Sequence, residues 1–274
     1  MSIHSKPTRI TAPAITARKG GEKLVCLTAY TAPMAGILDA RADLLLVGDS
    51  LGMVVHGLPS TVGVTLEMMI MHGKAVARGA ERAMIVVDLP FGTYERSPRQ
   101  AHESAARIMA ETGCQAVKVE ACDGIPETIE FLVGRGIPVL GHVGLRPQAV
   151  NVDGGFRAKG RTETERERVL AEASAVEAAG AFATVVEGVD AQIASEVTRA
   201  LKIPTIGIGA SADCDGQILV TEDMLGMFDW SPKFVRRYAN LRETIGQAAE
   251  DYARDVRAST FPGEAELYRL KRAK

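Results

Sequence analysis

Acidic side chains close several of the short apolar runs in this chain. They are Asp49, Asp88, Glu120 and Glu187, and His142 closes a further run. Any one of these acids could be a helix cap or a turn residue. Four together are harder to explain in that way. The Leu-Pro pair after Asp88 does not open a helix, which makes capping a poor account of that residue.

Carboxylates that meet at one place repel each other unless a cation or protons lie between them. Hard oxygen ligands favour Mg²⁺ over zinc, so the expected metal is magnesium. Lys118 lies two residues before Glu120, and on a strand both side chains point to the same face. A lysine beside such a cluster would suit an anionic substrate such as a carboxylic acid. The alternative, an exposed strand lysine, is less expected inside an apolar run.

Strand-like segments precede these polar residues. Short β-branched or leucine-rich runs, each followed by a turn and a helical pattern, predict parallel βα units. The segments are 23–28, 43–47, 84–88, 115–120, 138–142, 183–187 and 204–208, with a weak eighth near 225–228. Their near-continuous apolar character predicts strands buried on both faces. A repeat of roughly 30 residues favours an α/β fold, a closed (β/α)8 TIM barrel, over a doubly wound open sheet. In such a barrel the active site lies at the carboxyl ends of the strands.

Capping signals mark the helices between the strands. Ser97 with Gln100 and Thr162 with Glu165 form capping boxes, and Asp190 can cap a third helix. The glycine-rich segment 207–216 follows the seventh strand, where many barrels bind phosphate. It contains no basic residue, so tight turns are its expected role.

No Ser/Gly-rich linker or composition shift divides the chain. Residues 1–274 are therefore assigned to a single barrel domain with an N-terminal extension and a long C-terminal helix. Apolar residues near the end recur at alternating spacings of four and three on that helix. They are Phe234, Tyr238, Leu241, Ile245, Ala248 and Tyr252. This stripe predicts packing on the barrel or, alternatively, a subunit interface.

Composition excludes several classes of protein. Lys and Arg number 32 against 34 Asp and Glu, without the basic excess typical of nucleic-acid binding. No apolar stretch reaches the roughly 18 residues of a spanning helix, and no secretory signal is expected. The four cysteines have neither C-x-x-C nor zinc spacing, which indicates a reducing, cytoplasmic location.

Ten segments together resemble the ketopantoate hydroxymethyltransferase family. In family order over about residues 20–262, they are LTAY (27–30), VGDSLGMVVHG (47–57), DLPFGTY (88–94), VKVE (117–120), GHVGLRPQ (141–148), GGFRAKGR (154–161), VVEGV (185–189), IPTIGIGA (203–210), DGQILV (215–220) and PKFVRRYA (232–239).

The resemblance implies a (β/α)8 barrel of pantothenate and coenzyme A biosynthesis. It would transfer a hydroxymethyl group from 5,10-methylenetetrahydrofolate, as co-substrate, to 3-methyl-2-oxobutanoate through a Mg²⁺-stabilised enolate, giving 2-dehydropantoate. A homo-oligomer, often a decamer, is also implied.

The resemblance also implies roles for individual residues. Asp49 and Asp88 would coordinate magnesium, and Glu120 would support it or act as a ligand. The oxo acid would be held by Asp49, Ser50, Asp88 and Lys118. Glu187 would be the catalytic general base, and His142 would have an auxiliary polar role.

Three departures from the family pattern lie outside the catalytic acids. Thr31 replaces a common aspartate, Arg146 a frequent threonine and Ser211 a common glycine. The last two could alter loop conformation or folate affinity.

The closest alternative enzyme is a Mg²⁺-dependent 2-oxo-acid lyase or mutase of the phosphoenolpyruvate mutase and isocitrate lyase type, although the catalytic cysteine motif of isocitrate lyases is not found. A noncatalytic metabolite-binding barrel is a further alternative, against which the four acids argue.

Overall fold

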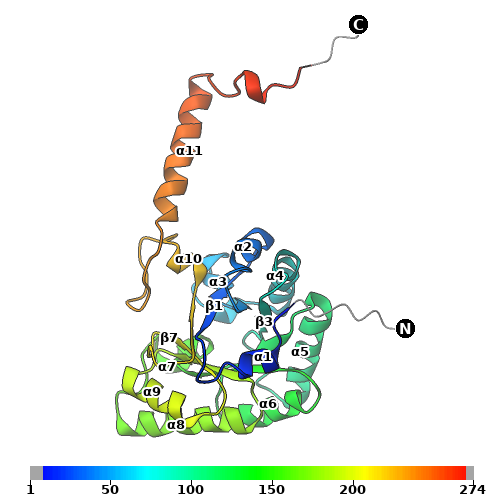
Figure 1. Ribbon diagram of the computed structural model, residues 1–274, viewed down its shortest axis with the longest axis vertical. Coiled ribbons are helices and arrows are strands. Elements are labelled where there is room, and N and C mark those ends of the chain that lie inside the picture. The colour runs from blue at the N-terminus through cyan, green and yellow to red at the C-terminus, as the bar shows by residue number, and fades with distance from the viewer. Residues whose placement is uncertain (1–8, 270–274) are drawn as a thin grey trace, which may run out of the picture. The chain divides into compact units, whose positions relative to one another are not determined.

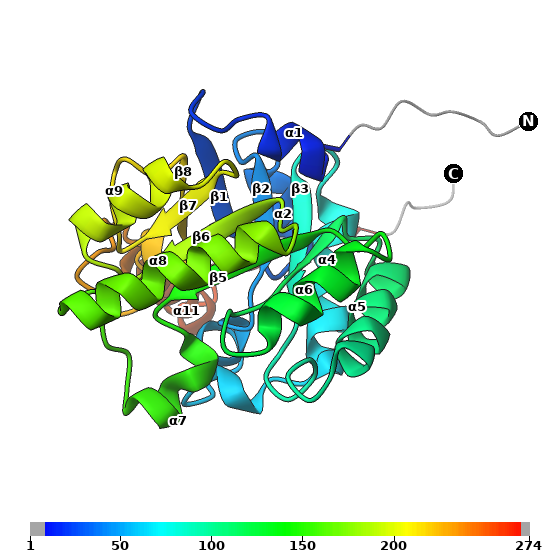
Figure 2. The same cartoon turned by 90° about the horizontal axis from the view of Figure 1, so that it is seen from below.

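Eight parallel strands form a closed barrel, in which β8 pairs back with β1. The computed structural model describes residues 9–269, and helices surround the strands (Figure 2). The strands are β1 (Leu24–Thr28), β2 (Leu44–Val47), β3 (Met84–Asp88), β4 (Ala116–Lys118), β5 (Val139–Gly144), β6 (Ala183–Glu187), β7 (Thr205–Ile208) and β8 (Gly216–Leu219). The predicted (β/α)8 fold is confirmed.

Helices connect successive strands along the chain except between β7 and β8, and one helix precedes β1 (Figure 1). They are α1 (Ala12–Thr16), α2 (Ala32–Leu38), α3 (Leu51–Val54), α4 (Leu66–Gly79), α5 (Pro98–Thr112), α6 (Ile125–Val133), α7 (Val150–Asp153), α8 (Glu163–Ala178), α9 (Ala191–Ala200), α10 (Thr221–Met224) and α11 (Leu241–Arg257), with short 3₁₀ turns at Thr61–Gly63, Pro147–Ala149 and Glu264–Glu266. No helix among residues 9–269 is long and apolar enough to cross a membrane. All four cysteines are free thiols, as their spacing predicts.

The predicted capping residues begin their helices. The side chain of Ser97 accepts from the backbone N–H of Gln100 at 3.2 Å, and Thr162 does the same for Glu165. The return bond is displaced by one residue, because Gln100 Oε1 accepts from the N–H of Arg96 rather than from that of Ser97. Each cap still satisfies amide donors that the first turn of a helix leaves without a partner.

Two hydrophobic clusters explain why the strands are buried on both faces. One cluster consists of alternate residues of the strands, and α1 is the only helix that contributes to it. Its strand members include Leu44, Leu46, Met84, Val86, Ala116, Leu140, Ala183 and Val185. The other takes the intervening strand residues together with those of the surrounding helices. Because successive side chains of a strand point to opposite faces, the first cluster fills the barrel and the second joins it to the helices.

The crossing from β7 to β8 has no helix. Only the seven residues 209–215 connect the two strands, and Gly207 makes room for them. A Cβ atom at Gly207 would lie 3.1 Å from Cys214 Sγ and 3.0 Å from Gln217 Nε2. The eighth strand therefore begins at Gly216, and its predicted position at 225–228 is wrong, since those residues follow α10.

By its internal contacts the chain divides into two compact units, residues 1–221 and 222–274. Within the second unit, the predicted long helix begins later than the apolar stripe suggested. The N–H of Tyr238 donates to the carbonyl of Met224, and that of Leu241 to the carbonyl of Leu225. These bonds to the last residue of α10 and to the residue after it replace helical bonds, so Phe234 and Tyr238 precede α11. None of the residues of α11 is buried.

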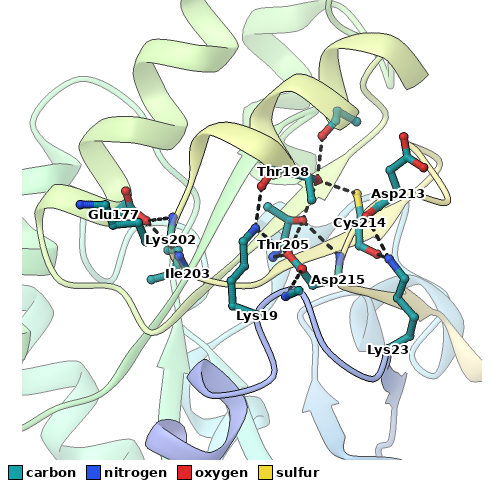
Figure 3. A network of polar contacts seen from close by, with 12 residues as sticks. Lys19, Lys23, Glu177, Thr198, Lys202, Ile203, Thr205, Asp213, Cys214 and Asp215 are labelled. Carbon is teal, nitrogen blue, oxygen red and sulfur yellow. Dashed lines mark hydrogen bonds and ion pairs between the residues drawn. The ribbon is translucent and has the colours of Figure 1, made fainter.

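Asp215 joins the amino-terminal ends of β7, β8 and β1. Its Oδ2 accepts from the N–H of Thr205 and from Lys19 Nζ, both at 2.9 Å, and its Oδ1 accepts from the N–H of Gly20 at 2.9 Å (Figure 3). Burial alone would raise the pKa of Asp215, but these bonds outweigh it and lower the pKa below its ordinary value. The carboxylate thus closes the barrel where the helix after β7 is missing.

Replacing Asp215 by asparagine should lower the free energy of unfolding by about 2 to 4 kcal/mol at pH 7, because a buried ion pair with Lys19 and charged hydrogen bonds are lost. Since the folded pKa lies below the unfolded value of about 3.9, this stabilisation is present above that pH and is lost as the pH falls through the folded pKa. Urea unfolding at pH 7 and at pH 3 measures both. The exposed neighbour Asp213, changed to asparagine, is the control, and an equal loss in both variants would contradict the assignment.

Candidate active site

Side chains alternate between the two faces of each strand, and the predicted site residues lie on the face that points into the barrel. Asp88, Lys118, His142 and Glu187 each lie two positions beyond a residue of the interior cluster, at or near the carboxyl end of a strand. Asp49 and Ser50 directly follow β2 and Glu120 follows β4. Asp49, Asp88, Lys118, Glu120 and His142 are all at least 95% buried. The structure therefore brings every predicted site residue to one mouth of the barrel.

Asp88 is held from two sides. It pairs with Lys118 in the β3–β4 register, and Lys118 Nζ lies 2.9 Å from Asp88 Oδ1. Its other oxygen, Oδ2, accepts from the backbone N–H of Asp49 at 3.0 Å. The ammonium of Lys118 is thereby fixed at the centre of the acidic group.

The carboxyl groups of this mouth outnumber its cations. Burial and the charge of Asp88 raise the pKa of Asp49 to about 7, and the two carboxyl groups share a hydrogen bond. Burial and Asp49 also raise the pKa of Glu120 well above its ordinary value. Lys118 opposes both shifts, but one ammonium cannot neutralise this many carboxylates. The site therefore favours additional positive charge.

Buried His142 and partly buried Glu187 form a second pair. Glu187 Oε2 lies 3.6 Å from His142 Nε2, which donates to the carbonyl of Leu145 at 2.7 Å. Burial, followed by the charge of Lys118, lowers the pKa of His142 well below its ordinary value, so the ring is neutral. Burial raises the pKa of Glu187 to about 8 against the opposing charge of Lys118. A carboxyl group with such a pKa is suited to accept a proton near neutral pH.

Gln148 and Tyr94 hold the acids in place, and neither residue was predicted to have a role in the site. Gln148 Nε2 donates to Asp49 Oδ2 at 2.8 Å, and its backbone N–H donates to the carboxylate of Glu120 at 3.2 Å. Its Oε1 accepts from the hydroxyl of Tyr94 at 2.7 Å. Both residues end segments that resemble the family, but a loop glutamine has no periodicity or spacing that would single it out.

A second network reaches Ser50 from the other side. The hydroxyl of Tyr30 lies 2.8 Å from Ser50 Oγ. The carbonyl of Tyr30 accepts from His72 Nδ1 at 2.7 Å, and His72 Nε2 lies 3.0 Å from Nε2 of the exposed His56. Because a carbonyl only accepts, Nδ1 of His72 carries a proton. The orientation of Ser50 is thus tied to α4.

The carboxyl pair of Asp49 and Asp88 fits a magnesium ion. It supplies hard oxygen donors, and a cation would relieve the repulsion that raises the pKa of Asp49. Within residues 9–269, no three His, Cys, Asp or Glu side chains are grouped so as to hold a metal ion. Magnesium commonly uses one or two carboxylates and completes its coordination with substrate and water. Whether Glu120 is a ligand stays a prediction.

Comparison with known proteins shows the family of this chain. The family profile of ketopantoate hydroxymethyltransferase matches residues 9–264. The chain belongs to this family. It is 66% identical over 273 residues to the 3-methyl-2-oxobutanoate hydroxymethyltransferase of Phenylobacterium zucineum, covering 99% of both chains, and 64% identical over 277 residues to that of Maricaulis maris, covering 100% and 99%. This member of the ketopantoate hydroxymethyltransferase family is therefore an enzyme, a transferase.

Solved structures share the fold at low sequence identity. Phosphonopyruvate hydrolase aligns with a TM-score of 0.60 at 15% identity, covering 95% of this chain and 92% of that one. A 2,3-dimethylmalate lyase, a member of the PEP mutase/isocitrate lyase superfamily, aligns with a TM-score of 0.60 at 15% identity, covering 92% and 86%. At this identity the likeness shows the fold alone.

Proposed function

We propose that the chain transfers a hydroxymethyl group from 5,10-methylenetetrahydrofolate to 3-methyl-2-oxobutanoate, giving 2-dehydropantoate for pantothenate synthesis. Family membership supports the reaction. The observation that carries the mechanism is the partly buried Glu187, whose pKa is raised to about 8, at the same mouth as the Asp49, Asp88 and Lys118 cluster. Such a site can remove a proton next to a carbonyl group whose charge is balanced by cations.

The oxo acid binds through its carboxylate and its keto oxygen. Lys118 and Ser50 bind the anionic end, since Lys118 is the buried ammonium at the centre of the cluster. Asp49 and Asp88 would hold magnesium, which when bound supplies positive charge that stabilises an enolate. Gln148 keeps Asp49 and Glu120 in their positions.

Glu187 is the general base of this mechanism. It takes the proton from C3 of the oxo acid, and the electron pair of that C–H bond moves into the enolate. The enolate carbon then forms a bond to the one-carbon unit of the folate, and water supplies the hydroxyl oxygen. Both C–N bonds of that unit break, so tetrahydrofolate leaves with a proton on each of the two nitrogens. Neutral His142, held through its bond to Leu145, leaves the carboxylate of Glu187 free of an ion pair that would weaken it as a base.

Exchange of the C3 proton of 3-methyl-2-oxobutanoate with deuterated water tests the proposal. We expect exchange that requires Mg²⁺, and hydroxymethyl transfer that also requires the folate. Cleavage of 2-oxo acids without folate would favour the lyase or mutase alternative. Metal-independent exchange would contradict the magnesium assignment.

Tyr30 is proposed to position Ser50 for the oxo acid, and Tyr30→Phe tests this. Loss of the hydroxyl removes the hydrogen bond to Ser50, so the KM for the oxo acid should rise about fivefold while kcat changes less. Steady-state kinetics measure both, with Tyr268→Phe at a fully exposed position as the control. An unchanged KM would remove Tyr30 from this role.

The proposal also includes a cytoplasmic location and a homo-oligomer, for which the family resemblance suggests a decamer. Free cysteines support a reducing compartment. The helix α11, which has no buried residue and exposes Ile245, Tyr252 and Val256, supports association between copies.

A further inference from the structure

A small cavity lies where the chain leaves β5, beside α8. Its volume is about 110 Å³, and it is lined by Gly144, Arg146, Lys159, Glu165, Arg168, Val169 and Glu172. Space of this size takes several water molecules or one small polar group. None of its charged lining residues belongs to the catalytic cluster described above.

The cavity adjoins the segment that carries the general base. Gly144 is the register partner of Glu187, and the N–H of the next residue, Leu145, donates to the carbonyl of Glu187 at 2.8 Å. On the other side, the N–H of Lys159 donates to the carbonyl of Gly188 at 2.8 Å. The cavity therefore lies beside the backbone of Glu187 and Gly188, directly behind the residue that carries the general base.

Arg146 is the cation of this cavity that lacks a carboxylate. Lys159 Nζ lies 2.9 Å from Asp153, and Arg168 Nε lies 2.8 Å from Glu172. Arg146 Nη1 donates to the carbonyl of Ala121 at 3.0 Å, and no acidic group in the described part of the chain forms an ion pair with it. Its remaining guanidinium donors are therefore available to a ligand.

The charge of the lining indicates what kind of anion would fit. Two of the three cations of the lining, Lys159 and Arg168, are paired with Asp153 and Glu172. The remaining cation, Arg146, can balance a single carboxylate. A dianionic phosphate would leave excess negative charge beside Glu165 and Glu172. The carboxylate of the oxo acid is already assigned to Lys118 and Ser50, which leaves the second substrate as its source.

We propose that this cavity is a subsite for a carboxylate on the glutamate arm of the folate, with Arg146 as its principal contact. The inference rests on the proposed function, because it takes the folate as the one-carbon donor. Arginine binds a carboxylate through charge-assisted and often bidentate hydrogen bonds. Arg146 thus makes the enzyme prefer a one-carbon donor that carries the glutamate arm over one that lacks it.

Two donors separate the arm from the reacting end. Arg146→Gln is compared with the starting protein on 5,10-methylenetetrahydrofolate and on the methylene adduct of 6-(anilinomethyl)tetrahydropterin, which keeps the two nitrogens that hold the methylene group but lacks the glutamate arm. We expect the KM for the first donor to rise about tenfold relative to the KM for the second, the loss expected for one charge-assisted bond. The matched control is Arg199→Gln, at an exposed arginine on α9. Equal changes for both donors, or none, would overturn the subsite.

Direct binding keeps this test independent of catalysis. Calorimetry with 4-aminobenzoylglutamate should show binding that Arg146→Gln weakens about tenfold and that 4-aminobenzamide, without the glutamate, does not reproduce. Equal competition by inorganic phosphate would overturn the choice of a carboxylate, as would fragment binding that is the same in the variant. If the starting protein neither exchanges the C3 proton nor transfers the one-carbon unit, the proposed function fails, whereas this binding result still decides the subsite.

Discussion

Replacing Glu187 by glutamine should slow exchange of the C3 proton of 3-methyl-2-oxobutanoate by about 10³-fold, the contribution of a positioned general base. Glutamine has nearly the same shape but cannot accept the proton. Binding of the oxo acid with Mg²⁺ should change little, because Lys118 and the Asp49 and Asp88 pair stay intact. Proton exchange is followed by NMR in deuterated water, and binding by calorimetry.

The same residue predicts the pH dependence of exchange. Only the deprotonated form of Glu187 is a base, so the rate should rise with pH and fall about tenfold for each pH unit below the pKa. Burial raises that pKa to about 8, with added contributions from Asp49 and Asp88 and an opposing one from Lys118. A cation between the two aspartates would lower it. The midpoint of the pH profile should therefore lie at or below about pH 8. It should be lower at a saturating Mg²⁺ concentration than at a subsaturating one.

The control for this experiment is Glu167→Gln, at an exposed position on α8. Exchange at an unchanged rate in Glu187→Gln would remove Glu187 from the role of base. A rate that falls as the pH rises from 6 to 8 would contradict the direction of the titration.

Replacing Asp49 by asparagine should weaken Mg²⁺ binding and oxo-acid binding together, by about 100-fold. The fold should tolerate the change, because burial and Asp88 already raise the pKa of Asp49 to about 7, and asparagine resembles its neutral form. Gln148 would still have an oxygen to which it can donate. Calorimetric titration with Mg²⁺, in the presence and absence of the oxo acid, measures the effect.

Asp88→Asn separates metal binding from the Lys118 ion pair. This variant should lose Mg²⁺ binding as Asp49→Asn does, and it should also be less stable by about 3 kcal/mol, because the buried ammonium of Lys118 loses its countercharge. Circular dichroism and thermal unfolding show whether the fold is retained, and Asp213→Asn is the surface control. Full activity of the starting protein in the presence of a chelator would contradict the metal assignment.

The alternation of the strands was readable from the sequence because both faces of a barrel strand are buried. The strands Met84–Asp88 and Ala183–Glu187 lie at their predicted bounds. The predicted position of the eighth strand was wrong. The short connection 209–215 contains no helix and packs closely against Gly207, and no periodicity in the sequence indicates such a connection. The predicted start of the C-terminal helix was also wrong. An apolar stripe alone does not show that backbone N–H groups bond to Met224 and Leu225 instead of continuing the helix.

The acids and the lysine that could do chemistry were predictable from the sequence, because residue type and position after an apolar run are local properties. The barrel was also predictable, since a repeat of apolar runs is visible in one dimension. The groups that hold these residues were not, because they come together only in the folded chain. Gln148 between Asp49 and Glu120, Tyr30 beside Ser50, and the cavity with Arg146 all join loops that are distant in the sequence. Such contacts depend on how loops converge at the barrel mouth, and the raised pKa of Glu187 depends on the burial that this convergence produces.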